Sequence, residues 1–353
     1  MLANILVRPG RIDLREMPEP QPSRGEILIK IRAALTCGTD LKAFRRGHPV
    51  IPMPGVFGHE FSGIIAKAGR MVRRFKEGDE VMAVHSAPCL QCRYCRKKLY
   101  NLCENIMATK VLGAFAEYIL LPSHIVKQNV YHKPEELSFE EAAFLEPLSC
   151  VVHGMESIRV KREDRALVIG AGPIGLLHLL LLREKGARVT VMDKHKEKLR
   201  TARGLGADVT VVARSSPPAL CKEGISGKGG NDRRLKSFED SPGFDHVFEC
   251  TGIPEVWENT VNYVRRGGTV TLFGGCKAGA MVTYDTCRLH YDEITIKGTF
   301  HFTPHDVKKA YDLLVGRRIG VARLISGSYP LEQTQKAFER LSKGVGIKYA
   351  IIP

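Results

Sequence analysis

The sequence predicts an α/β protein with two domains, one β-rich and one built on a doubly wound parallel sheet. Its 353 residues are enough for two separate hydrophobic cores. Roughly the first 150 residues read as short β-strands separated by turns. After about residue 154 strands alternate with helices, which is the pattern of a parallel sheet with helices on both faces.

Strands in the first part are predicted from the alternation of polar and apolar residues, which is typical of a half-buried strand. The segment Glu26–Arg32 alternates for most of its length, and Glu60–Ala66 and Asp79–Val84 look similar. Turn-forming residues such as Lys76–Asp79 separate these segments. We therefore expect a β-rich domain here.

The second part begins with Ala166–Ile169, a continuous apolar strand suited to burial on both faces of a sheet. A helix-like stretch follows it to Lys185. A charged helix is predicted at Lys194–Leu205. The further strands are predicted at Arg188–Met192, Phe244–Glu249, Thr269–Leu272 and Glu293–Ile296.

Three further segments complete the predicted organisation. Residues 214–242 are rich in Ser, Gly, Pro and charge, and we interpret them as a surface excursion from the second domain. Pro304–Val315 predicts an amphipathic helix. The last strand is predicted at Gly346–Ile352, and we expect it to return to the first domain.

The composition is that of an ordinary globular protein, and the distribution of its charged and apolar residues argues against binding to nucleic acid or membranes. The formal net charge is +15, but the lysines and arginines are scattered and do not interleave with aromatic residues. A solvated basic surface explains this charge better than a nucleic-acid site. The first residues lack a signal-peptide pattern, and the longest apolar run, Ala166–Leu182, is broken by glycines, a proline and a histidine. We expect a cytoplasmic protein that binds neither nucleic acid nor membranes.

A dinucleotide site is predicted by the glycine pattern that follows the first buried strand. Gly170, Gly172 and Gly175 permit a tight turn, close approach of a pyrophosphate, and close packing of helix on strand. The helix that opens there would direct its N-terminus at the phosphates. Asp193 ends the second strand and suits the ribose hydroxyls of NAD, whereas the nearby Lys194, Lys196 and Lys198 leave NADP as the alternative.

Four cysteines within fifteen residues predict a metal site. Cys89, Cys92, Cys95 and Cys103 have spacings that allow four thiolates to surround one tetrahedral Zn²⁺. A closed four-cysteine shell leaves no position for substrate, so this zinc would be structural. Buried free thiols or an iron–sulfur cluster are the alternatives. The lobe would span about residues 86–105.

A second, dispersed set of possible metal ligands consists of Cys37, His59, Glu60 and Glu146. A catalytic zinc needs about three protein ligands and one open position. Taken alone, each of these residues is ordinary, because a cysteine before glycine is usually buried and a His-Glu pair is usually on the surface. Their joint occurrence with the other motifs favours a catalytic site.

The order of these motifs along the chain (CGTD, GHE, the four cysteines, EPLS and GAGPIG) resembles the zinc-dependent medium-chain alcohol dehydrogenase superfamily, most closely its sorbitol (L-iditol) and polyol dehydrogenase branch. The resemblance covers nearly the whole chain. It implies a GroES-like catalytic domain at 1–153 and 300–353, a Rossmann domain at 154–299, and an active site in the cleft between them. It also implies a homodimer or homotetramer.

The resemblance implies roles for the site residues. Cys37 and His59 match constant zinc ligands, and Glu60 matches the acid that ligates zinc in the sorbitol branch. Glu146 matches the acid that replaces an alcohol dehydrogenase cysteine and binds zinc directly or through its water. Zinc would lower the pKa of a substrate hydroxyl, Thr39 would carry the proton outward, and hydride would pass to NAD. The implied cofactor contacts are Gly170, Gly172, Pro173, Ile174, Gly175, Asp193, Lys198, Thr251, Phe273, Gly274, Phe300 and His301.

Two departures from the polyol branch bear on the substrate. Lys42 stands where a relay histidine is common, and it would stabilise the alkoxide electrostatically. His301 and Phe302 replace an Arg-Tyr pair that lines the sorbitol pocket. A secondary alcohol of the polyol or cyclitol class is the prediction. The alternatives are a sugar-phosphate, amino-polyol or threonine-type dehydrogenase, for which Lys42, Arg45 and Arg46 offer anion partners, and a catalytically lapsed NAD-binding protein.

Overall fold

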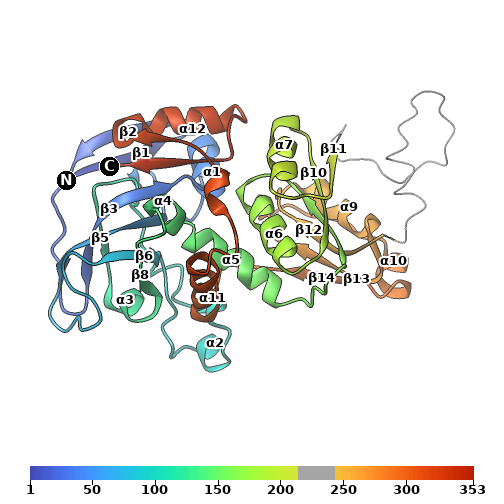
Figure 1. Cartoon of the computed structure of the whole chain (residues 1–353), viewed down its shortest axis with the longest axis horizontal. Helices are drawn as coiled ribbons and strands as arrows, with labels where there is room; N and C mark the ends of the chain where they lie inside the picture. The colour runs from blue at the N-terminus through green and yellow to red at the C-terminus, as the bar shows by residue number, and fades with distance from the viewer. Residues whose placement is uncertain (214–242) are drawn as a thin grey trace. The chain divides into compact units, whose positions relative to one another are not determined.

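The computed structural model describes residues 1–213 and 243–353 (Figure 1). The excursion predicted at 214–242 lies outside the described residues. The chain divides into two compact units. Unit 1 consists of Met1–His153 and Phe300–Pro353, and unit 2 of Gly154–Thr299.

Unit 1 is rich in strands, as its sequence predicts. Its strands are β1 (Leu2–Arg8), β2 (Arg11–Glu16), β3 (Ile27–Leu35), β4 (Gly55–Val56), β5 (Glu60–Ala68), β6 (Glu80–Val84), β7 (Tyr118–Leu121), β8 (Val130–His132), β15 (Ile325–Pro330) and β16 (Lys348–Ile352). Its helices are α1 (Gly38–Arg46), α2 (Arg93–Arg96), α3 (Ser123–Asn129), α4 (Phe139–Ala142), α5 (Leu145–Glu156, which ends in unit 2), α11 (Pro304–Val315) and α12 (Thr334–Ser342).

The helices α1, α2, α3, α4 and α5 are absent from the sequence-based expectation for the first 150 residues. The physical reason for α1, α2, α3 and α4 is their length, since they have 9, 4, 7 and 4 residues. Segments of about two turns or fewer show too little periodicity to be recognised without their tertiary contacts. Length does not explain α5, which has 12 residues.

The main sheet of unit 1 has seven strands, in the order β15-β16-β3-β5-β6-β8, with β7 also pairing with β3. The C-terminal strand β16 runs parallel to β15 and antiparallel to β3. The predicted return of the chain end to the first domain is therefore confirmed. A smaller sheet, β2-β1-β4, completes the unit.

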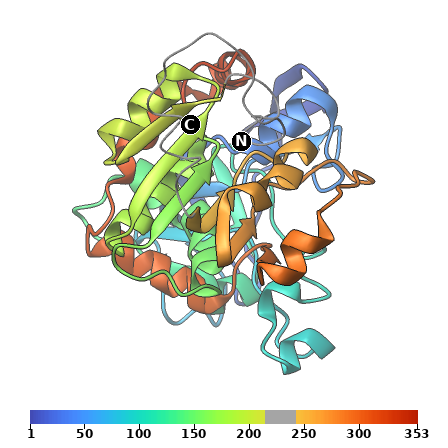
Figure 2. The ribbon, with the colours of Figure 1, turned by 90° about the vertical axis from the view of Figure 1, so that its right-hand side faces the viewer.

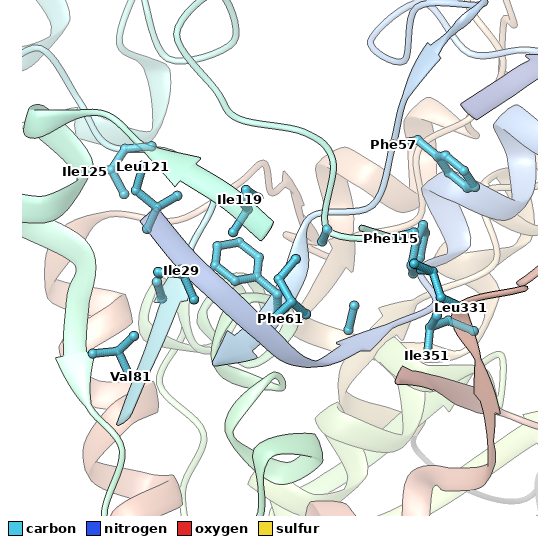
Figure 3. Close-up of a cluster of buried hydrophobic side chains, with 14 of the residues drawn as sticks. Ile29, Phe57, Phe61, Val81, Phe115, Ile119, Leu121, Ile125, Leu331 and Ile351 are labelled. Carbon is cyan, nitrogen blue, oxygen red and sulfur yellow. The ribbon is translucent and has the colours of Figure 1, made fainter. Parts of the chain in front are cut away.

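The core of unit 1 is one cluster of buried apolar side chains from β3, β5, β6, β7 and the C-terminal segment (Figure 3). Ile29 and Phe61 on the paired strands β3 and β5 are fully buried in it. Burying a side chain of this size contributes roughly 1.5–3 kcal/mol. The cluster therefore holds β3 and β5 rigidly, and the residues that directly follow β3 and begin β5 belong to the candidate site.

Unit 2 contains a six-stranded parallel sheet in the order β11-β10-β9-β12-β13-β14. Its elements are β9 (Arg165–Ile169), α6 (Pro173–Glu184), β10 (Arg188–Asp193), α7 (Lys196–Gly204), β11 (Val209–Val212), β12 (Phe244–Glu249), α9 (Pro254–Asn259), β13 (Val264–Leu272), α10 (Thr286–Tyr291) and β14 (Thr295–Gly298). Helices α6 and α7 lie on one face and α9 and α10 on the other (Figure 1). The predicted doubly wound sheet is confirmed.

The strand order reverses between β9 and β12, which are neighbours at the centre of the sheet. The yellow-green strands run side by side in Figure 2. Ligands of such sheets bind beyond the carboxyl ends of the strands at this reversal. The apolar run at 166–182 is divided between β9 and the 12-residue helix α6. Within the described ranges, every helix is too short or too polar to cross a membrane.

Candidate functional site

The four cysteines lie together on a short lobe of unit 1 around α2, which projects away from the strands (Figure 1). Their sulfur atoms all lie within 4.8 Å of one another. The Sγ atoms of Cys89 and Cys95 are 4.0 Å apart, and those of Cys92 and Cys103 are 3.9 Å apart. Four thiolates at about 2.3 Å from one zinc would be about 3.8 Å apart, so these residues fit a tetrahedral Zn²⁺.

The backbone of the lobe favours the thiolate form of two of the four cysteines. The N–H group of Gln91 is the main cause that lowers the pKa of the Cys89 thiol to about 6. The N–H group of Cys95 lowers the pKa of Cys92. Burial instead raises the pKa of Cys95 to about 12 and also raises the pKa of Cys103. Thiolate is the form that binds zinc, so the backbone prepares Cys89 and Cys92, and a bound metal would stabilise the thiolates of the two buried cysteines.

The dispersed set begins at Cys37, the N-cap of α1, whose Sγ accepts a hydrogen bond from the Thr39 N–H group at 3.5 Å. The Cys37 sulfur lies within 4.8 Å of donor atoms of Asp40 and His59. Nδ1 of His59 is 3.5 Å from Oδ1 of Asp40, which is fully buried. A carboxylate facing a ligand histidine fixes the tautomer and orientation of the ring. Asp40, which sequence reasoning did not select, is therefore placed to orient the ring of His59 through this ionic contact.

Glu60 begins β5, and its carboxylate pairs with the ammonium group of Lys348 at the start of β16. Both side chains are 1% exposed. Lys348 also donates to the carbonyl oxygen of Thr36 at 2.8 Å. The lysine therefore offsets one negative charge of the cluster. Oε1 of Glu60 is buried without a hydrogen-bond partner among the described residues.

Glu146 lies in the first turn of α5 and has a donor atom within 4.8 Å of those of His59 and Glu60. Its Oε1 is 3.4 Å from Nδ1 of His85, which follows β6. The rings of His85 and His59 are 5.0 Å apart. Two groups of possible ligands thus share His59, and together they contain all four dispersed residues that the sequence singled out.

A divalent cation would satisfy this cluster. Burial raises the pKa of Cys37 and of Glu60, and it raises the pKa of Glu146 to about 7. Apart from the 3.5 Å contact with His59, which is too long for a good hydrogen bond, both carboxylate oxygens of Asp40 are buried without a hydrogen-bond partner in the described part of the chain. Buried acidic groups without compensation are costly, and a nearby cation removes that cost. Sulfur, nitrogen and carboxylate donors together are those that zinc takes.

Thr39 and Lys42 lie on α1 just after Cys37, and both are half-buried. Arg45 belongs to the last turn of the same helix and is directed elsewhere. Its guanidinium donates to the carbonyl oxygen of Leu341 and to Oγ of Ser342, each at 3.3 Å. The last turn of α1 is thus tied to the end of α12.

The glycine turn of unit 2 has the geometry that its sequence requires. Gly170 has φ +105°, a conformation that favours glycine. A Cβ atom at Gly175 would lie 1.8 Å from the carbonyl oxygen of Gly170, so only glycine fits there. Gly172 is the N-cap of α6, and Pro173 and Ile174 form its first turn. The N–H groups of this turn can bind an anion.

Asp193 ends β10 and holds the glycine turn. Its Oδ2 accepts a hydrogen bond from the Ala171 N–H group at 2.7 Å, and its Oδ1 accepts one from His195 N–H at 2.8 Å. Lys198 on α7 is half-buried, whereas Lys194 is exposed.

The other predicted cofactor residues fall into both units. Thr251 follows β12, and Phe273 and Gly274 follow β13, at the carboxyl ends of adjacent parallel strands. Phe300, which is 49% exposed, and His301 belong to unit 1. Their cofactor contacts stay predictions.

The pair that replaces Arg-Tyr offers one polar side chain. Nε2 of His301 lies 2.6 Å from Oγ of Ser86, whereas Phe302 is 1% exposed. Of these two positions, only His301 can therefore form a side-chain hydrogen bond.

Sequence reasoning missed Asp40, His85 and Lys348. Asp40 follows Cys37 by three residues, and on a helix such residues lie on the same face. This spacing could have shown that Asp40 lies near the Cys37 sulfur. His85 directly precedes the cysteine lobe. Lys348 is 288 residues from Glu60 and carries no local signal.

Comparisons with known proteins cover nearly the whole chain. Residues 23–133 match the family described as Alcohol dehydrogenase GroES-like domain, and residues 173–316 match the family described as Zinc-binding dehydrogenase. D-arabinitol dehydrogenase 1 of Uromyces fabae is 31% identical over 100% of this chain and 97% of its own length. Sorbitol dehydrogenase of Ovis aries is 30% identical over 99% of this chain and 96% of its own.

A solved structure agrees over the same extent. A protein of Sinorhizobium meliloti 1021, assigned as a zinc-binding dehydrogenase and solved with NADP bound, is 30% identical. It superposes with a TM-score of 0.86 and covers 100% of this chain and 99% of that chain. Its cofactor is the alternative that the lysines near Asp193 leave open.

Proposed function

The chain belongs to the zinc-dependent medium-chain alcohol dehydrogenase superfamily, and we propose that it oxidises a secondary hydroxyl of a polyol or cyclitol with NAD as hydride acceptor. Its polyol dehydrogenase relatives make it a zinc-dependent oxidoreductase of secondary alcohols. The substrate class and the preference for NAD over NADP are the proposed parts.

The observation that carries this proposal is the convergence of Cys37, His59, Glu60 and Glu146. They come from three separate places in the sequence, since His59 and Glu60 are adjacent. With Asp40, their donor atoms form two overlapping groups, each within 4.8 Å. Unpartnered buried oxygens in the same cluster favour a bound cation. We assign the catalytic zinc to these residues and the structural zinc to the four cysteines.

The residues of the cluster would divide the work. A bound zinc supplies Lewis acidity that lowers the pKa of an alcohol hydroxyl, and NAD accepts the hydride. Asp40 would hold the His59 ring, and Lys348 would keep the charge of Glu60 from making the site too anionic. Thr39 would carry the proton outward from the substrate, and Lys42 would stabilise negative charge near it.

The organisation of the enzyme is also proposed. Unit 1 would be the catalytic domain and unit 2 the NAD-binding domain. The family acts on small-molecule alcohols, and we propose a cytoplasmic homodimer or homotetramer. Met281 lies in the segment between β13 and α10, and Tyr291 ends α10, directly before the edge strand β14. They are 86% and 76% exposed, and exposed apolar side chains of this kind favour association.

A phosphorylated or amino-polyol substrate is less well supported than a neutral polyol. The anion site considered for a phosphate depended on Lys42, Arg45 and Arg46. Arg45 instead bonds to the end of α12, so fewer donors remain to converge on a phosphate. The intact set of possible zinc ligands argues against a catalytically lapsed protein.

The test is a screen of secondary alcohols, including polyols, cyclitols and their monophosphates, for NADH and NADPH formation at 340 nm. We expect a neutral polyol or cyclitol to be oxidised with NAD. Metal analysis should give two zinc ions per chain. A preference for a phosphorylated substrate or for NADP would contradict the corresponding part of the proposal.

A further inference from the structure

Glu249, at the end of β12, carries a carboxylate that the proposed reaction does not use. The side chain is fully buried. Its Oε1 accepts hydrogen bonds from the N–H groups of Thr251 at 2.6 Å and Gly252 at 3.1 Å, and from the Thr251 hydroxyl. Its Oε2 accepts from Nε1 of Trp257 at 2.9 Å. All of these partners are neutral donors, so the carboxylate fixes their positions without forming an ion pair with them.

The same residue holds the turn after the next strand. The backbone carbonyl oxygen of Glu249 accepts hydrogen bonds from Phe273 N–H at 2.9 Å and Gly274 N–H at 3.0 Å. Nε1 of Trp257 also lies 3.0 Å from the carbonyl oxygen of Gly274. Glu249 therefore connects the turns that follow β12 and β13, two neighbouring parallel strands.

The turns after β12 and β13 are in close van der Waals contact, with no room for an added side chain. A Cβ atom at Gly274 would lie 2.2 Å from the nitrogen of Gly252 and 2.7 Å from Oε2 of Glu249. A Cβ atom at Gly170 would lie 3.0 Å from the methyl group of Thr251. The carboxylate, the two turns and the glycine turn after β9 thus form one packed assembly at the carboxyl edge of the sheet.

This edge is where a doubly wound sheet binds a dinucleotide, one mononucleotide to each half. Asp193 in the β9–β11 half is suited to the adenosine ribose, so the β12–β14 half faces the nicotinamide nucleotide. We propose that Glu249 is a positioning residue of the cofactor site, which sets the Thr251–Gly252 and Gly274 turns against which the nicotinamide nucleotide binds. The inference rests on the proposed function, because it assumes a nicotinamide cofactor.

A carboxylate suits this role and an amide does not. The donors approach both oxygens of Glu249, and an amide can accept at only one end. In Glu249→Gln, the NH₂ group would therefore face either the Trp257 N–H or the backbone N–H groups, whichever way it turns. The substitution keeps the volume of the side chain, so it should shift the turns rather than empty the core.

The chain has a built-in probe, since Trp257 is its one tryptophan. We would measure Trp257 emission, NADH binding by quenching of that emission, zinc content, and the KM values for NAD and for the alcohol. In the intact zinc enzyme, Glu249→Gln should shift the emission and raise both the NADH Kd and the NAD KM about tenfold. The alcohol KM should change less than twofold, and the zinc content should not change.

Glu258→Gln is the matched control. Glu258 is next to Trp257 on α9, but its Oε1 accepts a hydrogen bond from Thr283 N–H at 2.8 Å, away from the assembly. This variant should bind NADH as the unaltered enzyme does. If Glu249→Gln fails to fold, Trp257→Phe removes one donor and NADH is followed by its own fluorescence. An NAD KM raised about threefold would then support the inference.

Two results would overturn the inference. One is a folded Glu249→Gln enzyme with unaltered NADH affinity and NAD KM, and the other is an equal loss in the Glu258→Gln control. If Glu249→Gln does not fold, an unaltered NAD KM in Trp257→Phe would likewise overturn the inference. An unaltered chain that binds neither NADH nor NADPH would instead contradict the proposed function, so the two failures are distinguishable.

Discussion

The two candidate metal centres of unit 1 are built in opposite ways. The cysteine lobe takes four identical ligands from fifteen residues around α2. The buried cluster takes its four from the N-cap of α1, the loop before β5, the first residue of β5, and α5. The first can be recognised from spacing alone, whereas the second exists only after the sheet and helices have formed. A local centre supports its own lobe, and a dispersed centre depends on the whole unit.

The two centres also differ in what surrounds them. On the lobe, Leu90 is 54% exposed and Leu99 43%, and Cys89 and Cys92 are partly exposed, whereas Cys95 and Cys103 are buried within the lobe itself. In the other cluster, Asp40 is fully buried, and Glu60 and Lys348 are 1% exposed. Buried charges cost free energy unless they are compensated, and their concentration in one place is typical of a functional site. The difference predicts opposite consequences when each centre is damaged.

The largest effect is expected from removing a ligand of the dispersed centre. Substituting Cys37 or His59 by Ala should lower kcat/KM by at least about 10³-fold, because the Lewis acidity of a bound metal is worth several kcal/mol. The fold should remain, since the apolar core of β3 and β5 is untouched. Steady-state kinetics, circular dichroism and zinc content check this.

Zinc analysis separates the two centres in the same variants. Each variant should retain about one zinc per chain, held by the cysteine lobe. An active Cys37→Ala enzyme, or one that has lost both metals, would show that the centres are not separate in the way described.

Damage to the lobe should act on stability instead of chemistry. Cys92→Ser should remove the structural zinc and lower stability by about 3 kcal/mol, or roughly 6–12 °C in Tm. Activity per folded molecule should stay within about twofold, measured below the new Tm. Cys287→Ser is a suitable control, because Cys287 is an exposed thiol of unit 2. Loss of activity without loss of Tm would contradict a structural role.

The sequence predicted the fold class and the local motifs because they depend on neighbours in the chain. The strand at Phe244–Glu249 and the helix at Pro304–Val315 agree with the structure residue for residue. Their periodicity is complete within a single element. The short helices of unit 1 were not predicted, because the contacts that stabilise them come from distant residues.

The same reasoning explains which site residues were found. The proposed ligands were named from the order of motifs, but the residues that tune them were not. Lys348 reaches Glu60 only because β16 pairs with β3, and β3 pairs with β5. Periodicity and spacing contain no information on a pairing across 288 residues. Electrostatic partners of a dispersed site therefore need the structure.

The buried pair predicts a difference between the two carboxylates of the dispersed centre. Glu60→Gln leaves the Lys348 ammonium buried without its partner, which should cost about 3 kcal/mol of stability. Glu146→Gln removes a carboxylate whose pKa burial already raises to about 7, so it should cost much less. Both should lower kcat strongly, with greater zinc loss for Glu60→Gln. Denaturant unfolding and metal analysis measure these effects.

A second substitution tests the cause of that difference. In Glu60→Gln with Lys348→Met, most of the lost stability should return, because no charge is left unpaired. If Glu60→Gln and Glu146→Gln are equally stable, the pair with Lys348 does not matter to the fold.

The cofactor site of unit 2 resembles the lobe in being local, and its specificity should depend on one residue. Asp193→Ser should shift the ratio of kcat/KM for NADP over NAD by about tenfold toward NADP, because the carboxylate repels the extra phosphate. The carboxylate also holds Ala171 N–H, so the KM for both cofactors should rise. Asp193→Asn, which keeps one acceptor, separates the charge from the hydrogen bonds. An unaltered enzyme that already prefers NADP would contradict this assignment.

The smallest effect is expected from substituting Arg45 and Arg46, which are close to Cys37 in sequence but are not directed at the dispersed centre. Arg45 and Arg46 follow Cys37 closely, yet Arg45 bonds to the end of α12 and Arg46 is exposed. Substituting both by Ala should cost about 1 kcal/mol or less of stability and change kcat/KM less than twofold. A polyol and its monophosphate should be compared at low and high salt. Salt screens the attraction between a phosphate and arginines, so a preference for the monophosphate should be largest at low salt. If that preference is found and disappears in the double variant, these arginines bind the substrate.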